Sequence, residues 1–185
     1  MKRIREVKKL VPFVNDRIRL RLLSMEDIDW YANAIYSDNY NRFMDNKVNK
    51  LDFAKVKMLL SNLALSYSIG CKVSGECRLI IEDVNTNEKI GGISLFEIEK
   101  DSIALGYWIL PAYQNKGYAQ CSINLIKDLV FGLSKIESII LEIQSANISS
   151  MMVAYKTGFN HIDTSQGKVM ENMKFELRKS QYVKR

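Results

Sequence analysis

The hydrophobic pattern of the first third of the chain predicts one strand followed by two helices. Residues 17–23 read Arg-Ile-Arg-Leu-Arg-Leu-Leu, and this alternation is typical of a half-buried strand. Ser24 precedes Asp27 by three positions, which indicates a helix start, so we expect a helix over 25–36. Apolar residues at helical spacing predict a second helix over 52–66.

Beyond the second helix the period changes from helical to alternating. Strands are predicted over 77–84 and 89–98, around the turn-forming residues 85–87, and over 102–110, where Pro111 ends the pattern. The remaining predicted elements are a helix over 117–132, a strand over 138–144, a helix over 148–156, and strands over 159–164 and 169–177. This order predicts a single domain of the mixed α/β class.

No repeat, low-complexity tract or linker divides the chain, so we expect one domain over 15–178 with a basic extension over 1–14 and a basic tail over 179–185. The net charge of +6 is concentrated at these two ends. The first nine residues carry five basic groups and one acid, the last eight carry four basic groups and no acid, and the charge between them is −2. The domain itself therefore does not favour a nucleic-acid partner, although the basic ends leave a nucleic-acid-directed protein as an alternative.

Cysteine and histidine usage excludes several kinds of chemistry. The three cysteines, Cys71, Cys77 and Cys121, are too few for a disulfide scaffold and form no Cys-x-x-Cys pair. His161 is the only histidine, which argues against a metal site and leaves a single residue through which a Ser-His or Cys-His mechanism could run. No apolar run reaches the roughly 18 residues of a membrane span, and the basic N-terminus lacks the apolar stretch of a secretory signal. We therefore expect a cytoplasmic protein without a membrane partner.

The segment 106–119 carries the clearest functional signal. It is a predicted strand that passes through a short polar loop into a helix at Gly117. A helix start presents free backbone N–H groups at the positive end of the helix dipole, which makes it a site for an anion such as phosphate. Gly117 allows the backbone to approach a ligand, and Ala119 keeps the first turn uncluttered. Further donors come from Gln114, Asn115 and Lys116. The alternative is an ordinary strand-to-helix connection.

Two motifs in this order resemble a known family. Gln114-x-x-Gly117-x-Ala119 fits the Gln/Arg-x-x-Gly-x-Gly/Ala motif of the GNAT superfamily of N-acetyltransferases, and the strand before it is similar to the branch that acetylates ribosomal-protein N-termini. Asn147 and Ser150, followed by a Gly-Phe pair at 158–159, resemble the family's second motif. The resemblance covers residues 15 to 178.

The resemblance implies a fold and a cofactor. The fold is a mostly antiparallel sheet, flanked by helices, whose fourth and fifth strands splay apart into a cleft. The cofactor is acetyl-CoA, without a metal ion. Its pantetheine arm would follow backbone groups near Trp108 and Ile109, with Asn147 and Ser150 on the far side of the cleft. Its pyrophosphate would bind the loop formed by Gln114, Asn115, Lys116, Gly117, Tyr118 and Ala119.

The catalytic residues of the family are only partly matched. Many relatives carry a glutamate where this chain has Ala104 and a tyrosine general acid where it has Ala154. Tyr155 is one residue later, a step of about 100° around a helix, and is kept as a candidate acid. Glu142 lies five residues before Asn147, where the ribosomal-protein alanine acetyltransferases have their base. The alternative for Glu142 is a strand residue that faces solvent or pairs with a lysine.

The resemblance therefore predicts an acetyl-CoA-dependent N-acetyltransferase that transfers acetyl directly to a primary amine. A protein N-terminus is the first acceptor to consider, and polyamines, aminoglycosides and other small amines stay open. A non-catalytic acyl-CoA-binding regulatory module is a further alternative, because the residues at positions 104 and 154 are alanines. The protein is expected to be a monomer or a homodimer.

Overall fold

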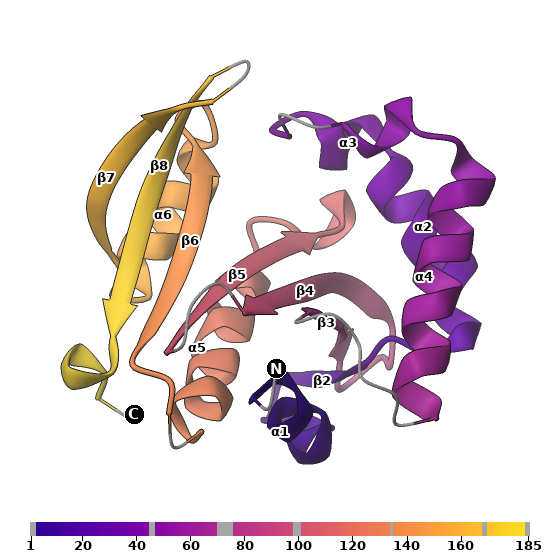
Figure 1. The fold of residues 1–185 in the computed structure, drawn as a ribbon, viewed down its shortest axis with the longest axis horizontal. Coiled ribbons are helices and arrows are strands. Elements are labelled where there is room, and N and C mark those ends of the chain that lie inside the picture. The colour runs from indigo at the N-terminus through magenta and orange to yellow at the C-terminus, as the bar shows by residue number, and fades with distance from the viewer. Residues whose placement is uncertain are drawn as a thin grey trace.

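The structure, a computed structural model, describes residues 3–44, 47–69, 76–97, 101–133, 135–167 and 170–183. Eight strands in this part of the chain form one sheet (Figure 1). In spatial order they are β1 (Phe13–Val14), β2 (Ile18–Leu22), β3 (Glu76–Asp83), β4 (Lys89–Glu97), β5 (Ser102–Ile109), β6 (Ser138–Gln144), β8 (Glu171–Arg178) and β7 (Asn160–Gln166). The pair β5–β6 is parallel and the other neighbours are antiparallel. The predicted mixed α/β class is confirmed.

Helices cover both faces of this sheet. They are α1 (Arg3–Leu10), α2 (Ile28–Tyr36), α3 (Asp38–Asn41), α4 (Phe53–Ser68), α5 (Tyr118–Phe131) and α6 (Ile148–Lys156). Figure 1 shows α2, α3 and α4 gathered at one side of the molecule, with α5 and α6 behind the central and C-terminal strands. The sheet therefore has two faces, which we call the α2/α4 face and the α5/α6 face.

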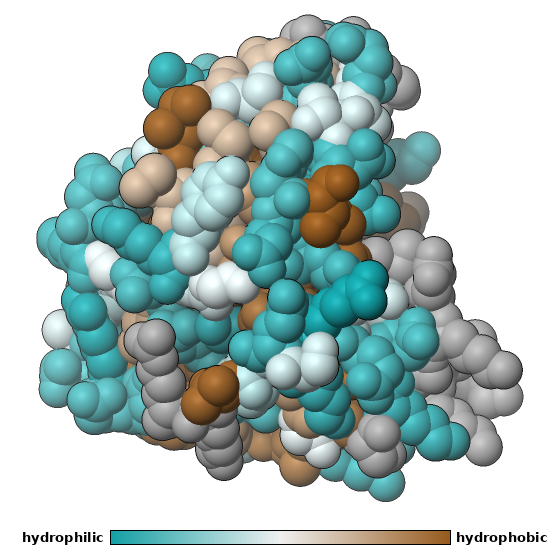
Figure 2. Space-filling model, turned by 90° about the vertical axis from the view of Figure 1, so that its left-hand side faces the viewer, coloured by the Kyte–Doolittle hydropathy of each residue, from teal (hydrophilic) through white to brown (hydrophobic). Residues whose placement is uncertain are grey.

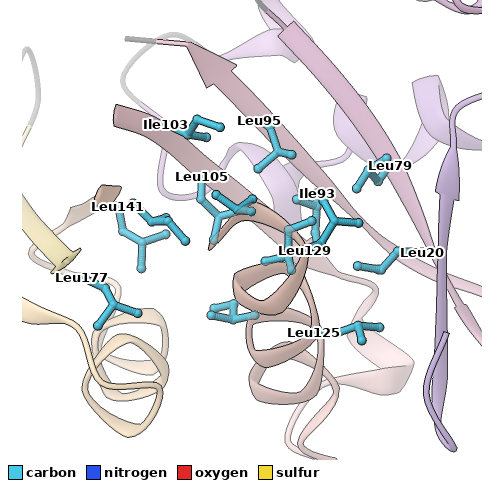
Figure 3. Packing of buried hydrophobic residues seen from close by; sticks show 14 of the residues in the cluster. Leu20, Leu79, Ile93, Leu95, Ile103, Leu105, Leu125, Leu129, Leu141 and Leu177 are labelled. Carbon is cyan, nitrogen blue, oxygen red and sulfur yellow. The ribbon is translucent and has the colours of Figure 1, made fainter. Parts of the chain in front are cut away.

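Two hydrophobic clusters, one on each face, hold these layers together. Alternation along β3 feeds both of them, because Leu79 and Ile81 point into the larger cluster and Ile80 into the smaller one. The smaller cluster joins the sheet to α2 and α4. Figure 3 shows the larger cluster, in which α5 meets the strands through Leu20, Leu79, Ile93, Leu95, Leu105, Leu125 and Leu129.

The N-terminal residues contribute structure that the charge pattern did not predict. Residues 3–10 form α1, whose Val7 is fully buried in the larger cluster, and Phe13–Val14 pairs with β2. Several predicted features lie outside the described residues. They are Cys71, the strand positions 98 and 169, and the chain ends 1–2 and 184–185.

The strands β5 and β6 separate after a short parallel contact. Only Ser102–Ala104 pairs with Ser138–Ile140, whereas β5 continues to Ile109 and β6 to Gln144. The sequence resemblance implied this splay between the fourth and fifth main strands, and it is confirmed. The diverging strand ends form the two walls of what we call the cleft.

The strand β7 forms the outer edge of the C-terminal half of the sheet. All seven of its residues are exposed, and its pairing with β8 is irregular between His161 and Asp163. Figure 2 shows this side of the molecule to be mostly hydrophilic. A polar edge strand with a local irregularity resists pairing with another chain.

Candidate active site at the splayed strands

The backbone of β5 presents unpaired groups to the cleft at alternate residues. The Leu110 N–H donates to the Ile90 carbonyl at 2.8 Å, so the backbone of Leu110 points toward β4. Residues whose backbone points to the same neighbouring strand alternate along an antiparallel ladder. The N–H and C=O groups of Trp108 therefore also point to β4, while those of Tyr107 and Ile109 point into the cleft. Of the two residues expected to supply backbone groups, the geometry places Ile109 on the cleft side.

The side chain of Trp108 forms part of the α2/α4 face instead. Its ring lies 5.5 Å from that of Trp30 and 5.3 Å from that of Tyr31, measured between centroids, and 6.1 Å from that of Tyr40. Its Nε1 is buried and has no hydrogen-bond partner in the described part of the chain. The indole thus closes an aromatic wall between β5 and the first helices.

The loop after β5 has the geometry of an anion site. Asn115 has φ of +60° and Gly117, the N-cap of α5, has φ of +80°, both in the left-handed region. The left-handed turn at Gly117 leads into the helix start, where the first N–H groups of α5 have no partner inside the helix. The N–H of Gln114 is already paired, because it donates to the Pro111 carbonyl at 3.2 Å. The backbone N–H groups that could face an anion are therefore those of residues 115–119.

The side chain of Gln114 braces the end of β5. Its Nε2 donates to the Ile109 carbonyl at 2.9 Å, so the motif glutamine satisfies a carbonyl that faces the cleft. The sequence suggested that this side chain would be a further donor for an anion. In the structure it fixes the angle between strand and loop, and the anion site depends on the backbone.

Arg17, at the start of β2, is a residue that the sequence reasoning did not connect with this loop. Its guanidinium donates to the Lys116 carbonyl and lies 4.4 Å from the centre of the Tyr118 ring. Because a trans peptide points its C=O and N–H in opposite directions, this contact turns the Gly117 N–H away from Arg17. Tyr118 is held in turn by Asp83, and the hydrogen bond from the Tyr118 hydroxyl lowers the pKa of that carboxyl.

The far wall of the cleft is the N-terminus of α6. Asn147 is its N-cap, and its Oδ1 accepts the Ser150 N–H at 3.1 Å. The Ser150 Oγ lies 2.7 Å from the Tyr107 hydroxyl, which joins β5 to α6 across the cleft. Burial raises the pKa of Tyr107 to about 12. Tyr107 was not among the predicted site residues, because its aromatic ring in a strand is typical of a core position.

Removing the Asn147 side chain is expected to destabilise the protein. The variant Asn147→Ala loses the cap of α6, and the free energy of unfolding is expected to fall by about 1 kcal/mol. Thermal or urea unfolding measures this change. Asn160→Ala, at an exposed edge position, is the control and is expected to stay within about 0.5 kcal/mol of the wild type. An equal loss in both variants would contradict a capping role.

Glu142 stands on the wall formed by β6. It is exposed between the buried residues Leu141 and Ile143, and it lies opposite Lys174 of β8 in the ladder. Side chains of paired strand residues share a face, and Ala104 pairs with Ile140. Glu142 therefore shares the α2/α4 face with Ala104 and, by alternation, with Trp108.

Packing on α6 differs between position 154, where many relatives have a tyrosine, and Tyr155. Ala154 is fully buried in the larger cluster, so a tyrosine ring has no room at that position. Tyr155 is 53% exposed, and its ring packs edge-on against Phe175 at 5.2 Å between centroids. Ser150 and Ala154 lie one turn apart on the same side of α6, and Tyr155 lies on another side.

A charged pair that the sequence did not predict, Glu76 and Arg78, lies on the α2/α4 face. The Arg78 Nε is 2.5 Å from a Glu76 carboxylate oxygen, and the guanidinium lies 5.8 Å from the centre of the Tyr31 ring. Arg78 of β3 pairs with Ser94 of β4, which pairs with Gly106 of β5. In the same way Glu76 pairs with Phe96, which pairs with Ala104. The small residues Ser94, Gly106 and Ala104 lie between this pair and the cleft on this face of the sheet, and we call them the small-residue floor. The charged residues at alternating positions 76 and 78 of β3 are the sequence signal that could have indicated this pair.

No three histidine, cysteine, aspartate or glutamate residues converge as metal ligands within the residues described. No helix among them is long and apolar enough to cross a membrane.

Comparisons with known proteins identify the family and the fold. The acetyltransferase (GNAT) domain family matches residues 17–160. No curated protein sequence matches the chain. Among solved structures, a spermidine N-acetyltransferase from Vibrio cholerae in complex with CoA and spermine is similar, with 21% identity and a TM-score of 0.75 over 90% of this chain and 98% of that one.

Two further structures show the same fold with other acceptors. RimL, a ribosomal L7/L12 alpha-N-protein acetyltransferase in complex with CoA, has 14% identity and a TM-score of 0.74 over 89% of this chain and 96% of its own. AAC(6')-Ib in complex with ribostamycin and CoA has 14% identity and a TM-score of 0.74 over 90% and 96%.

Proposed function

Because the chain belongs to the GNAT family of acetyltransferases, we propose that it transfers an acetyl group from acetyl-CoA directly to a primary amine. The observation that carries the proposal is the combination of an unpaired strand edge with an anion site at its open end. The pyrophosphate of CoA is an anion, and its pantetheine arm carries amides that can pair with a strand edge. CoA fits both parts of the site at once.

The cofactor residues follow from this fit. The pyrophosphate binds the backbone N–H groups of Asn115, Lys116, Gly117, Tyr118 and Ala119, with the Lys116 side chain adding positive charge. The pantetheine arm lies along β5, where Ile109 offers its cleft-facing N–H and Trp108 closes the α2/α4 side. Asn147 and Ser150 line the opposite wall. Gln114 supports the site through its bond to β5.

Glu142 is the proposed base of the reaction. An ammonium group cannot attack a carbonyl, so the acceptor must lose a proton, directly or through water, before its nitrogen attacks the thioester. Glu142 is exposed on the wall of the cleft, on the α2/α4 face, and can reach an amine held over the small-residue floor. The carbonyl oxygen becomes an oxyanion that a cleft-facing backbone N–H of β5 stabilises. The thiolate then leaves and takes up a proton.

The acceptor is proposed to be a protein N-terminal amine, because the strand before the loop is similar to that of the ribosomal-protein branch. A polyamine and an aminoglycoside are the alternatives, since spermidine N-acetyltransferase and AAC(6')-Ib share the fold. Incubation with acetyl-CoA and each of an N-terminal peptide library, spermidine and kanamycin tests them. Mass spectrometry detects the acetylated amine, and a thiol reagent detects released CoA.

The same assay tests the rival function of a regulatory acyl-CoA-binding module. A catalytic protein is expected to bind acetyl-CoA, which raises its Tm, and to acetylate at least one amine. A regulatory module would show the Tm increase with no turnover on any amine.

The monomer or homodimer state and the cytoplasmic location stay predictions. Light scattering at several protein concentrations measures the former.

Arg17→Ala is expected to weaken CoA binding about three- to tenfold, since one charge-assisted hydrogen bond that orients the loop is lost. Isothermal titration with CoA measures the Kd. Arg19→Ala removes a neighbouring arginine of β2 that pairs with Glu82 instead, and its Kd is expected to match the wild type. If both variants bind CoA equally well, Arg17 has no role in holding the loop.

A further inference from the structure

Tyr107 brings a partly buried hydroxyl to the α6 wall of the cleft. It lies three residues beyond Ala104, the last residue of β5 that pairs with β6. Its ring packs against the larger hydrophobic cluster, and its hydroxyl lies 2.7 Å from Ser150 Oγ on α6. Burial raises the pKa of this hydroxyl, which is protonated at neutral pH, and either it or the Ser150 hydroxyl donates the hydrogen bond between them.

Tyr107 and Glu142 lie at neighbouring depths in the cleft but on opposite faces of the sheet. Extending the register Ala104–Ile140 by two residues brings Gly106 level with Glu142. Because side chains alternate along a strand, Glu142 shares the α2/α4 face and Tyr107 shares the α5/α6 face. A nucleophile deprotonated by Glu142 thus attacks from one face, and the leaving group departs toward the other.

The reactive end of the cofactor reaches this depth. An arm that starts at the anion loop and follows β5 passes Ile109 first and Tyr107 next, before the strands close at Ala104. The thioester lies at the end of the arm that is farthest from the pyrophosphate. In acetyl-CoA bound in this way, the sulfur would come to the part of the cleft that Tyr107 and Ser150 span.

We infer that the Tyr107 hydroxyl, oriented by Ser150, protonates the departing CoA thiolate, an inference that rests on the proposed acetyl transfer. As the tetrahedral intermediate collapses, the carbon–sulfur bond breaks and its electron pair goes to sulfur. The Tyr107 proton passes to that sulfur and gives CoA-SH. The phenolate is then reprotonated from water through the Ser150 hydroxyl, so that the protein returns to its starting state.

This assignment explains why the chain functions without a tyrosine at position 154. Ser150 and Ala154 lie on the same side of α6, one turn apart, and β5 delivers the Tyr107 hydroxyl to that side. Ala154 is packed into the core, whereas Tyr155 contacts Phe175 and solvent. The acid thus comes from the strand instead of the helix.

The variant Tyr107→Phe tests the role, because it keeps the ring and removes only the hydroxyl. We expect kcat to fall about 100-fold, with the Kd for acetyl-CoA within a factor of two of the wild type. Single-turnover rates at saturating acetyl-CoA isolate the chemical step. Incorporation of 3-fluorotyrosine at 107, whose hydroxyl is more acidic, is expected to restore turnover. Tyr113→Phe is the control, since it removes a hydroxyl bonded to Glu88 outside the cleft, and its kcat is expected to be unchanged.

Further variants separate catalysis from packing. Ser150→Ala is expected to lower kcat by less than Tyr107→Phe, and the double variant is expected to be no slower than Tyr107→Phe alone, since the two hydroxyls act as one unit. A full kcat in Tyr107→Phe, or a loss in Tyr155→Phe without one in Tyr107→Phe, would overturn the inference. A wild-type protein that binds acetyl-CoA and acetylates no amine would instead overturn the proposed function.

Discussion

Replacing Glu142 by glutamine is expected to lower kcat by about 100- to 1,000-fold while the affinity for acetyl-CoA stays within a factor of two. The amide keeps the size of the side chain and its hydrogen-bonding capacity but cannot take a proton from the attacking amine. Because Glu142 stands on β6, away from the anion loop, the cofactor contacts are retained. Steady-state turnover with the best acceptor and isothermal titration with acetyl-CoA measure the two quantities.

Glu171→Gln provides a matched control for this experiment. Glu171 is an exposed strand glutamate in the same half of the sheet, and its position next to Asn172, which pairs with Gln144, places it on the opposite face from Glu142. Its kcat is expected to equal that of the wild type. An unchanged kcat in Glu142→Gln would remove Glu142 from the mechanism. Glu142 would then be a strand residue that faces solvent or pairs with a lysine, which is the alternative stated from the sequence.

The variant Gly91→Ala is expected to lower the free energy of unfolding by about 3 kcal/mol, the upper part of the range for inserting a group into a filled space. A Cβ atom at Gly91 would lie 2.3 Å from the Trp108 carbonyl oxygen, and both atoms belong to rigid backbone or are attached directly to it. The strands β4 and β5 would have to separate at the mouth of the cleft. For a chain of this size the corresponding decrease in Tm is roughly 6–12 °C, measured by calorimetry or circular dichroism.

Gly106→Ala is the comparison, because a Cβ at that glycine of β5 meets only the Ser94 side chain at 4.0 Å. Its stability is expected to lie within about 0.5 kcal/mol of the wild type. If the two alanine variants were equally stable, the close approach of β4 and β5 at Gly91 would not be needed for folding.

The main elements of the fold could be predicted because their patterns are strong and local. The alternation over 17–23 became β2, the motif around Asn147 became the start of α6, and 148–156 matches the observed helix. The helix α1 was missed because six charged residues among the first nine conceal the buried position Val7. The apolar residues Ile4, Val7 and Leu10 are few among these charges, and the burial of Val7 depends on the strands and the helix that it meets.

The candidate site was predictable only as far as its motifs are continuous in sequence. The loop at Gly117 and the cap at Asn147 are local, and their geometry follows from a few neighbouring residues. The contacts of Arg17 with the loop and of Tyr107 with Ser150 join residues 99 and 43 positions apart. One sequence carries no information on which distant residues meet, so these partners emerged only from the folded chain.

The three-residue ladder between β5 and β6 has a consequence for how the protein moves. A sheet whose two halves are joined by so few hydrogen bonds can bend between β5 and β6. The larger hydrophobic cluster, to which α5 contributes, packs against both strands and holds the halves together. A ligand that pairs with β5 and touches α6 replaces the missing rungs and couples the two halves mechanically. The occupied protein would then exchange its backbone amides more slowly along both walls, including at residues that never touch the ligand. The two walls of the cleft would become more rigid when the ligand binds and more mobile again when it is released.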